Sequence, residues 1–385
     1  MPAEGLFAGT YARGGAAEQT GERCWLQALL DVEAALARAC AHEELIPAPA
    51  AEAITAACRA EAFDAVAIGR EGGEHASVVV PLVSALREAV GDELAGYVHL
   101  GATSQDILDT AQMLVAQRAL APVLADAAAA AEAAVRLAGE HRTTPMAGRT
   151  LLQAALPTSF GLRAAGWLTG IDEARIRLDD VRILELAVEM GGPVGTRDPA
   201  IAACVAIELG LAEPALAWHT VRVRVGSLAG ALGVLAGVLA KVARDVTLLA
   251  GDGIGEVREG GGRARGRSTA MAHKRNPVAA VSVLACAHRV PGLVATVLAA
   301  MEQEHERAAG AWQAEWGTVS DLLTLTGSAT AWARDLLEHL EVDAERMRAN
   351  LERLAAAGVE EAADPEGHLG AASELIDRAL EAHRS

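Results

Sequence analysis

The chain carries three polar segments whose side chains are suited to binding anions and transferring protons. The first, YVHLGATSQDILDTA at residues 97–111, places His99, Thr103, Ser104 and Gln105 just before an expected helix. Hydroxyl side chains at the start of a helix cap its free N–H groups, and the same position binds anions. Both interpretations are open for this segment taken alone, because capping needs no ligand.

The second segment, GRTLLQAALPTSFGLRAAGW at residues 148–167, has a few polar residues inside an apolar run. Gln153 and Thr158 are candidates for substrate binding, because a buried Gln side chain must be satisfied by its neighbours or by a ligand. The alternative is structural: Thr158 and Ser159 follow Pro157, where they would cap the next helix.

The third segment, GGGRARGRSTAMAHKRNPVAA at residues 260–280, is rich in glycine and in positive charge. Its glycines predict a mobile lid that closes over a substrate, and Pro277 fits the first turn of the following helix. A solvated basic loop is the alternative, although such a loop does not need hydroxyl and amide side chains. The candidates for chemistry in this segment are Ser268, Thr269, His273, Lys274, Arg275 and Asn276.

The composition limits the kinds of partner. The 385-residue chain has a formal net charge of −18, which argues against nucleic acid or an anionic membrane surface as a partner. Hydrophobic residues make up 52% and aromatic residues only 3%, which favours helices packed on helices over a β-sandwich. An anionic ligand therefore requires positive groups that are concentrated locally.

Apolar periodicity predicts an all-α protein with a central antiparallel bundle of long helices. The sequence has no strong strand signal and no fixed-length repeat. The expected helices cover residues 22–41, 106–139, 158–190, 226–250, 277–306 and 317–341. We expect an N-terminal helical domain at 1–98, a central bundle domain at 99–340 and the remnant of a C-terminal domain at 341–385.

The most apolar stretch, residues 225–250, is predicted to be a bundle helix. Its Leu and Val residues alternate at spacings of four and three, which is typical of a helix with one buried seam. Lys241, Arg244 and Asp245 in its second half argue against a membrane span.

Cysteine usage and the N-terminal residues predict a cytoplasmic protein. The five cysteines lie far apart without a C-x-x-C motif, which indicates reduced thiols and no disulfide framework. No His, Cys, Asp and Glu set has the spacing of a metal site. The N-terminal residues lack the basic and then apolar pattern of an export signal.

The motifs GATSQD, RTLLQAALPTSFG and GRSTAMAHKRNPV, in this order, resemble the three signature regions of the fumarase/aspartase superfamily. Within it, the segments YVHLGATSQDILDTA, FGLRAAGWL, HKRNPVAAV and MEQEHERAAGAWQAEW are most similar to the bacterial 3-carboxy-cis,cis-muconate cycloisomerases. The likeness extends from about residue 5 to residue 351. It implies a fumarase/aspartase-like fold, a homotetramer whose active sites each combine regions from three subunits, and no cofactor.

The resemblance also implies roles for individual residues. Ser268 matches a serine that acts as the base in eliminating members, and Thr269 replaces a second serine. Lys274 and Asn276 match residues that hold a substrate carboxylate. The proton donor is open among His99, His273, Lys274 and Ser268. The residues implied in substrate binding are Thr103, Ser104, Gln105, Gln153, Thr158, Thr269, Arg275, Asn276 and Arg307, with Arg222 as a further cationic candidate.

The implied reaction is the conversion of 3-carboxy-cis,cis-muconate, or a close polycarboxylate, to a γ-lactone in aromatic (protocatechuate) catabolism. The alternatives are a β-eliminating lyase that releases fumarate or a related unsaturated acid from a substituted succinate, and a non-catalytic tetrameric paralogue. After residue 351 the chain continues with a segment like the family's extreme C-terminus, so a truncated C-terminal domain is expected. The sequence departs from the family pattern at Leu151, Ala154, Arg267, Ala272 and Gln313.

Overall fold

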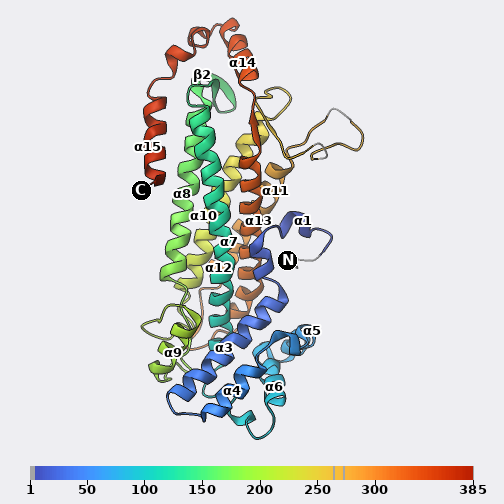
Figure 1. Ribbon diagram of the computed structural model, residues 1–385, viewed down its shortest axis with the longest axis vertical. Coiled ribbons are helices and arrows are strands. Elements are labelled where there is room, and N and C mark those ends of the chain that lie inside the picture. The colour runs from blue at the N-terminus through green and yellow to red at the C-terminus, as the bar shows by residue number, and fades with distance from the viewer. Residues whose placement is uncertain (1–4, 263–264, 272–273, 385) are drawn as a thin grey trace. The chain divides into compact units, whose positions relative to one another are not determined.

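The computed structural model describes residues 5–262, 265–271 and 274–384, and most of them are helical (Figure 1). This confirms the predicted all-α class, and each long helix overlaps a range expected from the apolar periodicity. The long helices are α7 (Ser104–Glu140), α8 (Phe160–Leu184), α10 (Val223–Leu249) and α13 (Ala311–Glu338).

Shorter elements complete the described part of the chain. The other α-helices are α1 (Ala8–Tyr11), α2 (Gly15–Gln19), α3 (Glu22–His42), α4 (Ala48–Ala57), α5 (Ala65–His75), α6 (Val79–Val90), α9 (Pro199–Leu209), α11 (Val278–Ala287), α12 (Val290–Ala299), α14 (Ala344–Ala356) and α15 (Ala372–Arg384). The 3-10 helices are η1 (Ala60–Ala62), η2 (Ala95–Tyr97), η3 (Glu360–Ala363) and η4 (Glu366–His368). The strands are β1 (Pro145–Thr150), β2 (Gln153–Ser159), β3 (Val257–Glu259) and β4 (Leu340–Val342).

The chain divides into two compact units, each assembled from three segments. Unit 1 contains Met1–Pro122, Leu178–Leu232 and Pro291–Gly327. Unit 2 contains Val123–Arg177, Gly233–Val290 and Ser328–Ser385. The four long helices contribute residues to both units. The division expected from the sequence, at residues 98 and 340, stays a prediction.

In unit 1, helix α3 packs against α4 and α9. Leu29, Val32 and Leu36 on this helix are all buried in the core, while Trp25 on the same face is half-buried. Apolar residues three and four positions apart lie on one helix face, which explains why this segment forms an amphipathic helix with that face inward.

In unit 2, two short antiparallel strand pairs were not expected from the sequence: the β1–β2 hairpin, and the pair β3–β4, whose strands are far apart along the chain. Thr158 pairs with Met146 across the first hairpin, so helix α8 begins at Phe160 and not at residue 158. Pro157 in β2 pairs with Ala147, next to the register shift between Ala147 and Arg149, and proline is found at such irregularities because it cannot donate to the ladder.

The long helix expected at residues 277–306 is two helices, α11 and α12. The break falls at His288 and Arg289, and Pro291 lies in the first turn of α12. Proline fits the first turn of a helix but interrupts the hydrogen bonds of a continuous one. This proline is the reason that one apolar run forms two helices.

Three helical segments are long and apolar enough to cross a membrane, by length and composition alone: α7, α10 and residues 278–299. About half of the apolar window is buried inside the chain in α7 (50%) and α10 (56%), and 39% in the third. In α10, Asp245 accepts a hydrogen bond from the Trp167 indole N–H at 2.7 Å. This contact fits a bundle helix that faces other helices.

Candidate active site

His99 is held in a strained backbone conformation and is oriented by a buried carboxylate. It lies between η2 and α7 with a φ of 63°, which non-glycine residues rarely adopt. Its Nδ1 is 2.6 Å from Oε1 of Glu33, whose side chain on α3 is fully buried. A carboxylate at one ring nitrogen fixes the tautomer and leaves Nε2 for proton transfer. Glu33 was not among the residues predicted from the sequence, although an acidic residue on the apolar face of a helix at residues 22–41 points to a buried polar role.

Asp106 fixes the GATSQD segment in place. Its buried carboxylate accepts a hydrogen bond from the Thr103 N–H at 3.0 Å, at the start of α7. It also accepts from the N–H groups of Gly191 and Gly192 at 3.2 and 2.9 Å. The half-buried hydroxyls of Thr103 and Ser104 make no hydrogen bond to the residues described here, so they are free to bind a ligand.

His219 belongs to a buried cluster behind this segment. Its Nε2 is 2.6 Å from Asp106 Oδ1 and 3.1 Å from Glu189 Oε1. Burial raises the pKa of Glu189 to about 8, well above the ordinary range of a carboxyl group. The three side chains satisfy the distances of a metal site, but backbone N–H groups already occupy the two carboxylates. The cluster therefore supports the segment and has no need of a cation.

Gln105 and Arg222 are placed in the core of unit 1, away from solvent. The Gln105 amide donates to Asp109 Oδ2 at 3.0 Å and to the His219 carbonyl at 2.6 Å, and the side chain is 1% exposed. The Arg222 guanidinium is fully buried between Asp109 and Glu315. This corrects the expectation that Arg222 meets a substrate anion, because both of its neighbours are carboxylates. The position of Gln105 likewise favours a supporting role.

Arg307 remains a candidate for anion binding in unit 1. Its Nη2 donates to the Gly192 carbonyl at 2.6 Å, and the side chain is only partly buried. Burial lowers its pKa from the ordinary range of arginine, opposed by the nearby carboxylates of Asp106 and Glu189. A guanidinium stays charged at any pH of interest, so Arg307 can meet an anion here.

The second segment forms the β1–β2 hairpin, and its tip is both strained and apolar. Leu151 and Leu152 occupy the two-residue turn with φ values of 50° and 65°, and their side chains are 95% and 74% exposed. Two positive φ values define a type I′ turn, which favours Asn-Gly. Gln153 is exposed beside this tip and Thr158 is half-buried in β2. Ser159 accepts from the Leu162 N–H at 3.1 Å, which confirms its predicted capping role.

A buried ion pair anchors this hairpin. Arg149 on β1 donates two hydrogen bonds to Glu256, at 2.9 and 2.7 Å, and the Glu256 side chain is fully buried. Asn350 donates to the same carboxylate at 2.7 Å. Because Glu256 directly precedes β3, this pair joins the second segment to the strand that leads into the third.

The third segment is a loop whose two ends are pinned together. Glu259, the last residue of β3, accepts from the N–H groups of Ala279 and Ala280 at 2.9 and 2.8 Å, in the first turn of α11. The Gly260 N–H donates to the His339 carbonyl at 2.8 Å. Several of the residues that the structure describes between these ends are exposed, including Arg267, Thr269, Met271 and Lys274.

Within the loop, Ser268 is placed as a proton acceptor would be. Its Oγ accepts hydrogen bonds from the N–H groups of Ala270 and Met271, at 3.3 and 3.1 Å. Two backbone N–H groups on a hydroxyl oxygen stabilise the negative charge that develops when the hydroxyl loses its proton. Thr269 next to it is exposed. His273 lies outside the described residues.

The loop borders a cavity of about 1040 Å³ in unit 2. Lys274, Arg275 and Asn276 line it, together with Arg258 and Arg265 and the acidic residues Asp252, Glu259 and Glu341. Arg258 and Arg265 are paired with carboxylates, whereas the exposed Lys274 ammonium has no ion-pair partner among the residues placed by the structure. Lys274 can therefore offer a positive charge to the carboxylate of a ligand, although the chain as a whole is acidic.

Gly266 is the residue on which the loop conformation depends, and we expect Gly266→Ala to lower turnover strongly without lowering the melting temperature. Its φ is 67°, and a Cβ there would lie 2.3 Å from the Asn276 carbonyl oxygen. Alanine must therefore break the contact in which the Asn276 N–H donates to the Gly266 carbonyl at 2.8 Å. Steady-state kinetics and thermal melting check this. The matched control is Gly253→Ala, where a Cβ meets nothing within 4 Å; equal turnover in both variants would contradict the prediction.

The candidate residues fall into two groups that belong to different units. Unit 1 holds His99, Thr103, Ser104, Gln105 and Arg307, and unit 2 holds Gln153, Thr158, Ser268, Thr269, Lys274, Arg275 and Asn276. The loop residues and the hairpin share one unit, while the GATSQD segment belongs to the other.

Comparison with known proteins gives consistent matches. A family model described as lyase matches residues 13–292. A 3-carboxy-cis,cis-muconate cycloisomerase of Pseudomonas aeruginosa is 45% identical over 360 residues, which cover 91% of this chain and 78% of the relative. A nitrosuccinate lyase of Streptomyces davaonensis is 44% identical over 348 residues, which cover 86% of this chain and 73% of the relative.

Solved structures match over nearly the whole chain. The 3-carboxy-cis,cis-muconate lactonizing enzyme from Pseudomonas putida superposes with a TM-score of 0.91 at 35% identity. The match covers 98% of this chain and 99% of that one. Because the superposition covers nearly the whole chain, the similarity is not limited to the long helices.

Proposed function

The chain belongs to the lyase family whose model it matches, and from this premise we propose that it is a cycloisomerase of 3-carboxy-cis,cis-muconate or a close polycarboxylate. The observation that carries the proposal is the Lys274 ammonium, which has no ion-pair partner among the described residues and lines one cavity with Asn276 and three arginines. A substrate with three carboxylates needs such a group in a chain of net charge −18.

The proposed reaction needs little from the protein except charge and one proton. A substrate carboxylate oxygen adds to one carbon of a C=C bond, and the electron pair moves to the neighbouring carbon and its carboxylate. A donor on the protein then gives a proton to that carbon and regains one from solvent, so the lactone has one negative charge fewer than the ionised substrate and is an isomer of its singly protonated form. The attacking carboxylate is already ionised and needs no base, while the developing charge is stabilised by Lys274 and Asn276. His99, His273, Lys274 and Ser268 are the candidate donors.

The experiment that tests the proposal is an ultraviolet assay on the purified protein. Loss of the absorption of the conjugated diene of 3-carboxy-cis,cis-muconate, with a γ-lactone as the product, is expected. An unchanged diene spectrum at high enzyme concentration would contradict it.

A β-eliminating lyase is the second candidate, and two observations favour it. The nitrosuccinate lyase relative is 44% identical to this chain, compared with 45% for the cycloisomerase of Pseudomonas aeruginosa. The Ser268 oxygen also accepts two N–H bonds, which suits a base that removes a proton from a substituted succinate. A panel of substituted succinates, with release of fumarate as the readout, separates the two candidates. A protein inactive on both substrate classes would instead support the non-catalytic paralogue.

We also propose that the chain forms a homotetramer with shared active sites, in the cytoplasm. Large apolar side chains are exposed on α8, α10, α11 and α12 of the single chain, which is typical of faces that pack against partners. These residues include Ile176, Ile183, Val234, Val281 and Leu298. The strained Leu151–Leu152 turn is a second such surface. None of the five cysteines forms a disulfide, which suits a reducing compartment.

Mixed oligomers test the shared site. One inactive parent carries Thr103→Ala with Ser104→Ala, and the other carries Ser268→Ala with Lys274→Ala. Co-expressed, they are expected to regain part of the activity, because some sites receive intact segments from different chains. The control is a mixture of the purified parents that is assayed before subunits exchange. No recovery in verified mixed oligomers would contradict shared sites.

A further inference from the structure

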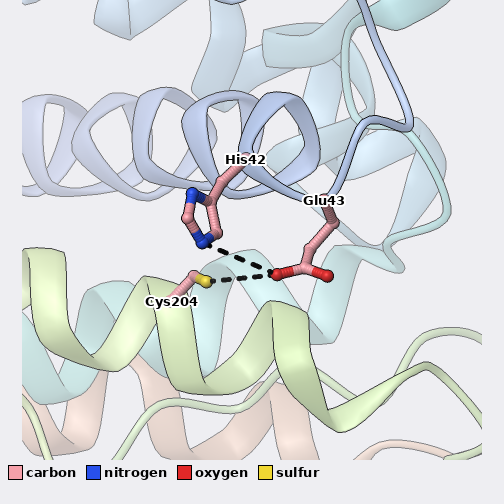
Figure 2. Close-up of side chains that lie close together, drawn as sticks. All are labelled: His42, Glu43 and Cys204. Atoms are coloured by element: carbon pink, nitrogen blue, oxygen red, sulfur yellow. Dashed lines mark hydrogen bonds and ion pairs between the residues drawn. The ribbon is translucent and has the colours of Figure 1, made fainter.

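Three metal-binding side chains converge on the surface of unit 1, outside the candidate active site (Figure 2). His42 is the last residue of α3, Glu43 follows it directly, and Cys204 lies on α9. The Glu43 Oε1 atom is 3.9 Å from His42 Nε2 and 3.9 Å from Cys204 Sγ. All three donor atoms lie within 4.8 Å of one another.

We propose that His42, Glu43 and Cys204 bind one divalent transition-metal ion of the Zn²⁺ class, with water as the fourth ligand. Tetrahedral zinc with its usual bond lengths places neighbouring ligand atoms about 3.4–3.6 Å apart. The two separations from Glu43 need to shorten by a few tenths of an ångström, and the His42–Cys204 separation, which is at most 4.8 Å, by at most about 1.4 Å. His42 is 75% exposed, so its ring can rotate to do so. Imidazole, thiolate and carboxylate together select this class of metal over Mg²⁺ or Ca²⁺.

The charges around the three side chains favour a cation. The carbonyl groups at the C-terminal end of α3 carry partial negative charge, which attracts positive ions. Burial and the nearby carboxylates of Glu43 and Glu208 raise the pKa of the Cys204 thiol, so the thiol is protonated without metal. A bound cation reverses this effect and releases the thiol proton. Glu208 is already paired with Arg38, which leaves Glu43 as the carboxylate ligand.

The site joins two segments that are distant in sequence. Glu43 and Cys204 are 161 positions apart, so no spacing along the chain marks them as ligands. A metal that binds both would hold the end of α3 against α9, and α3 and α9 already pack together. Metal binding is therefore expected to raise the melting temperature, because it stabilises only the folded state.

Cobalt(II) is the probe, since its bond to a thiolate absorbs in the near ultraviolet. The full-length protein, treated with chelator, is expected to develop this absorption with one Co²⁺ per chain, and Zn²⁺ should remove it by displacement. Cys204→Ser should abolish the absorption, and His42→Gln should weaken Co²⁺ binding at least about tenfold. Cys24→Ser is the matched control, because Cys24 is also partly exposed but donates to the Glu18 carbonyl.

The outcomes decide the proposal without reference to catalysis. Absence of the absorption in the parent protein, or its persistence in Cys204→Ser, would overturn the site. Its loss in Cys24→Ser would show that the wrong cysteine was assigned. Circular dichroism of each variant verifies that loss of the signal does not come from loss of the fold.

Discussion

Replacing Lys274 with Ala should lower turnover at least about a hundredfold while the melting temperature stays nearly unchanged. The exposed ammonium has no ion-pair partner in the described part of the chain, so its removal leaves the fold intact. A positive group that meets developing charge in a reaction is worth a factor of about a hundred to a thousand in rate. Turnover with the diene substrate and thermal melting measure the two effects.

The sequence offers an unusually clean control for this test. The chain has only two lysines, Lys241 and Lys274, among 33 basic residues, so arginine is its usual cation. A lysine at the loop therefore indicates a need for a compact ammonium, which arginine does not replace. Lys274→Arg should remain strongly impaired, and Lys241→Ala should be fully active. Near-normal turnover of Lys274→Ala would remove the proposed role of this residue in holding a carboxylate.

The largest effect on stability is expected from Arg222→Met, at about 3–5 kcal/mol of the free energy of unfolding. Removing the guanidinium leaves Asp109 and Glu315 buried without a counter-ion, since all three side chains are fully buried. Burial already raises the pKa of Glu315, and Arg222 opposes that rise. Urea denaturation followed by circular dichroism, at one fixed protein concentration, measures the change.

Two further variants serve as controls for Arg222→Met. Arg224→Met removes a partly exposed arginine that pairs with Glu185, so the expected change is below about 1 kcal/mol. Combining Arg222→Met with Asp109→Asn and Glu315→Gln should recover part of the lost stability, because neither of the two side chains that Arg222 paired with is then an ionised carboxylate. A parent-like midpoint for Arg222→Met alone would show that the buried charges are compensated in another way.

The sequence was sufficient to predict the long helices, because they depend on local periodicity. The seam of α10 and the stripe of α3 with Val32 and Leu36 are read directly from spacing. The β1–β2 hairpin was missed because its tip, Leu151–Leu152, resembles an apolar helix turn and carries no turn residue. The split between α11 and α12 was missed although Pro291 marks it.

The candidate site was predictable only where the motif is continuous in sequence. The loop residues Lys274 and Asn276 stand together in one segment, and the structure keeps them together at the cavity. The Glu33 carboxylate that orients His99 lies 66 positions away, so only the tertiary fold brings them together. Arg222 was assigned to the substrate on charge alone, and the two buried carboxylates that use its charge come from distant helices.

The β1–β2 turn also has a consequence for laboratory evolution of this protein. A library screened for heat resistance of separate chains would favour Asn-Gly at positions 151 and 152, since that pair suits the turn without strain. Under the proposed assembly, the same change removes apolar surface that a neighbouring chain covers. Selection for the heat resistance of separate chains would then lower the catalytic activity of the assembly. A screen that measures product formation at low protein concentration selects for stability of the chain and for assembly at the same time.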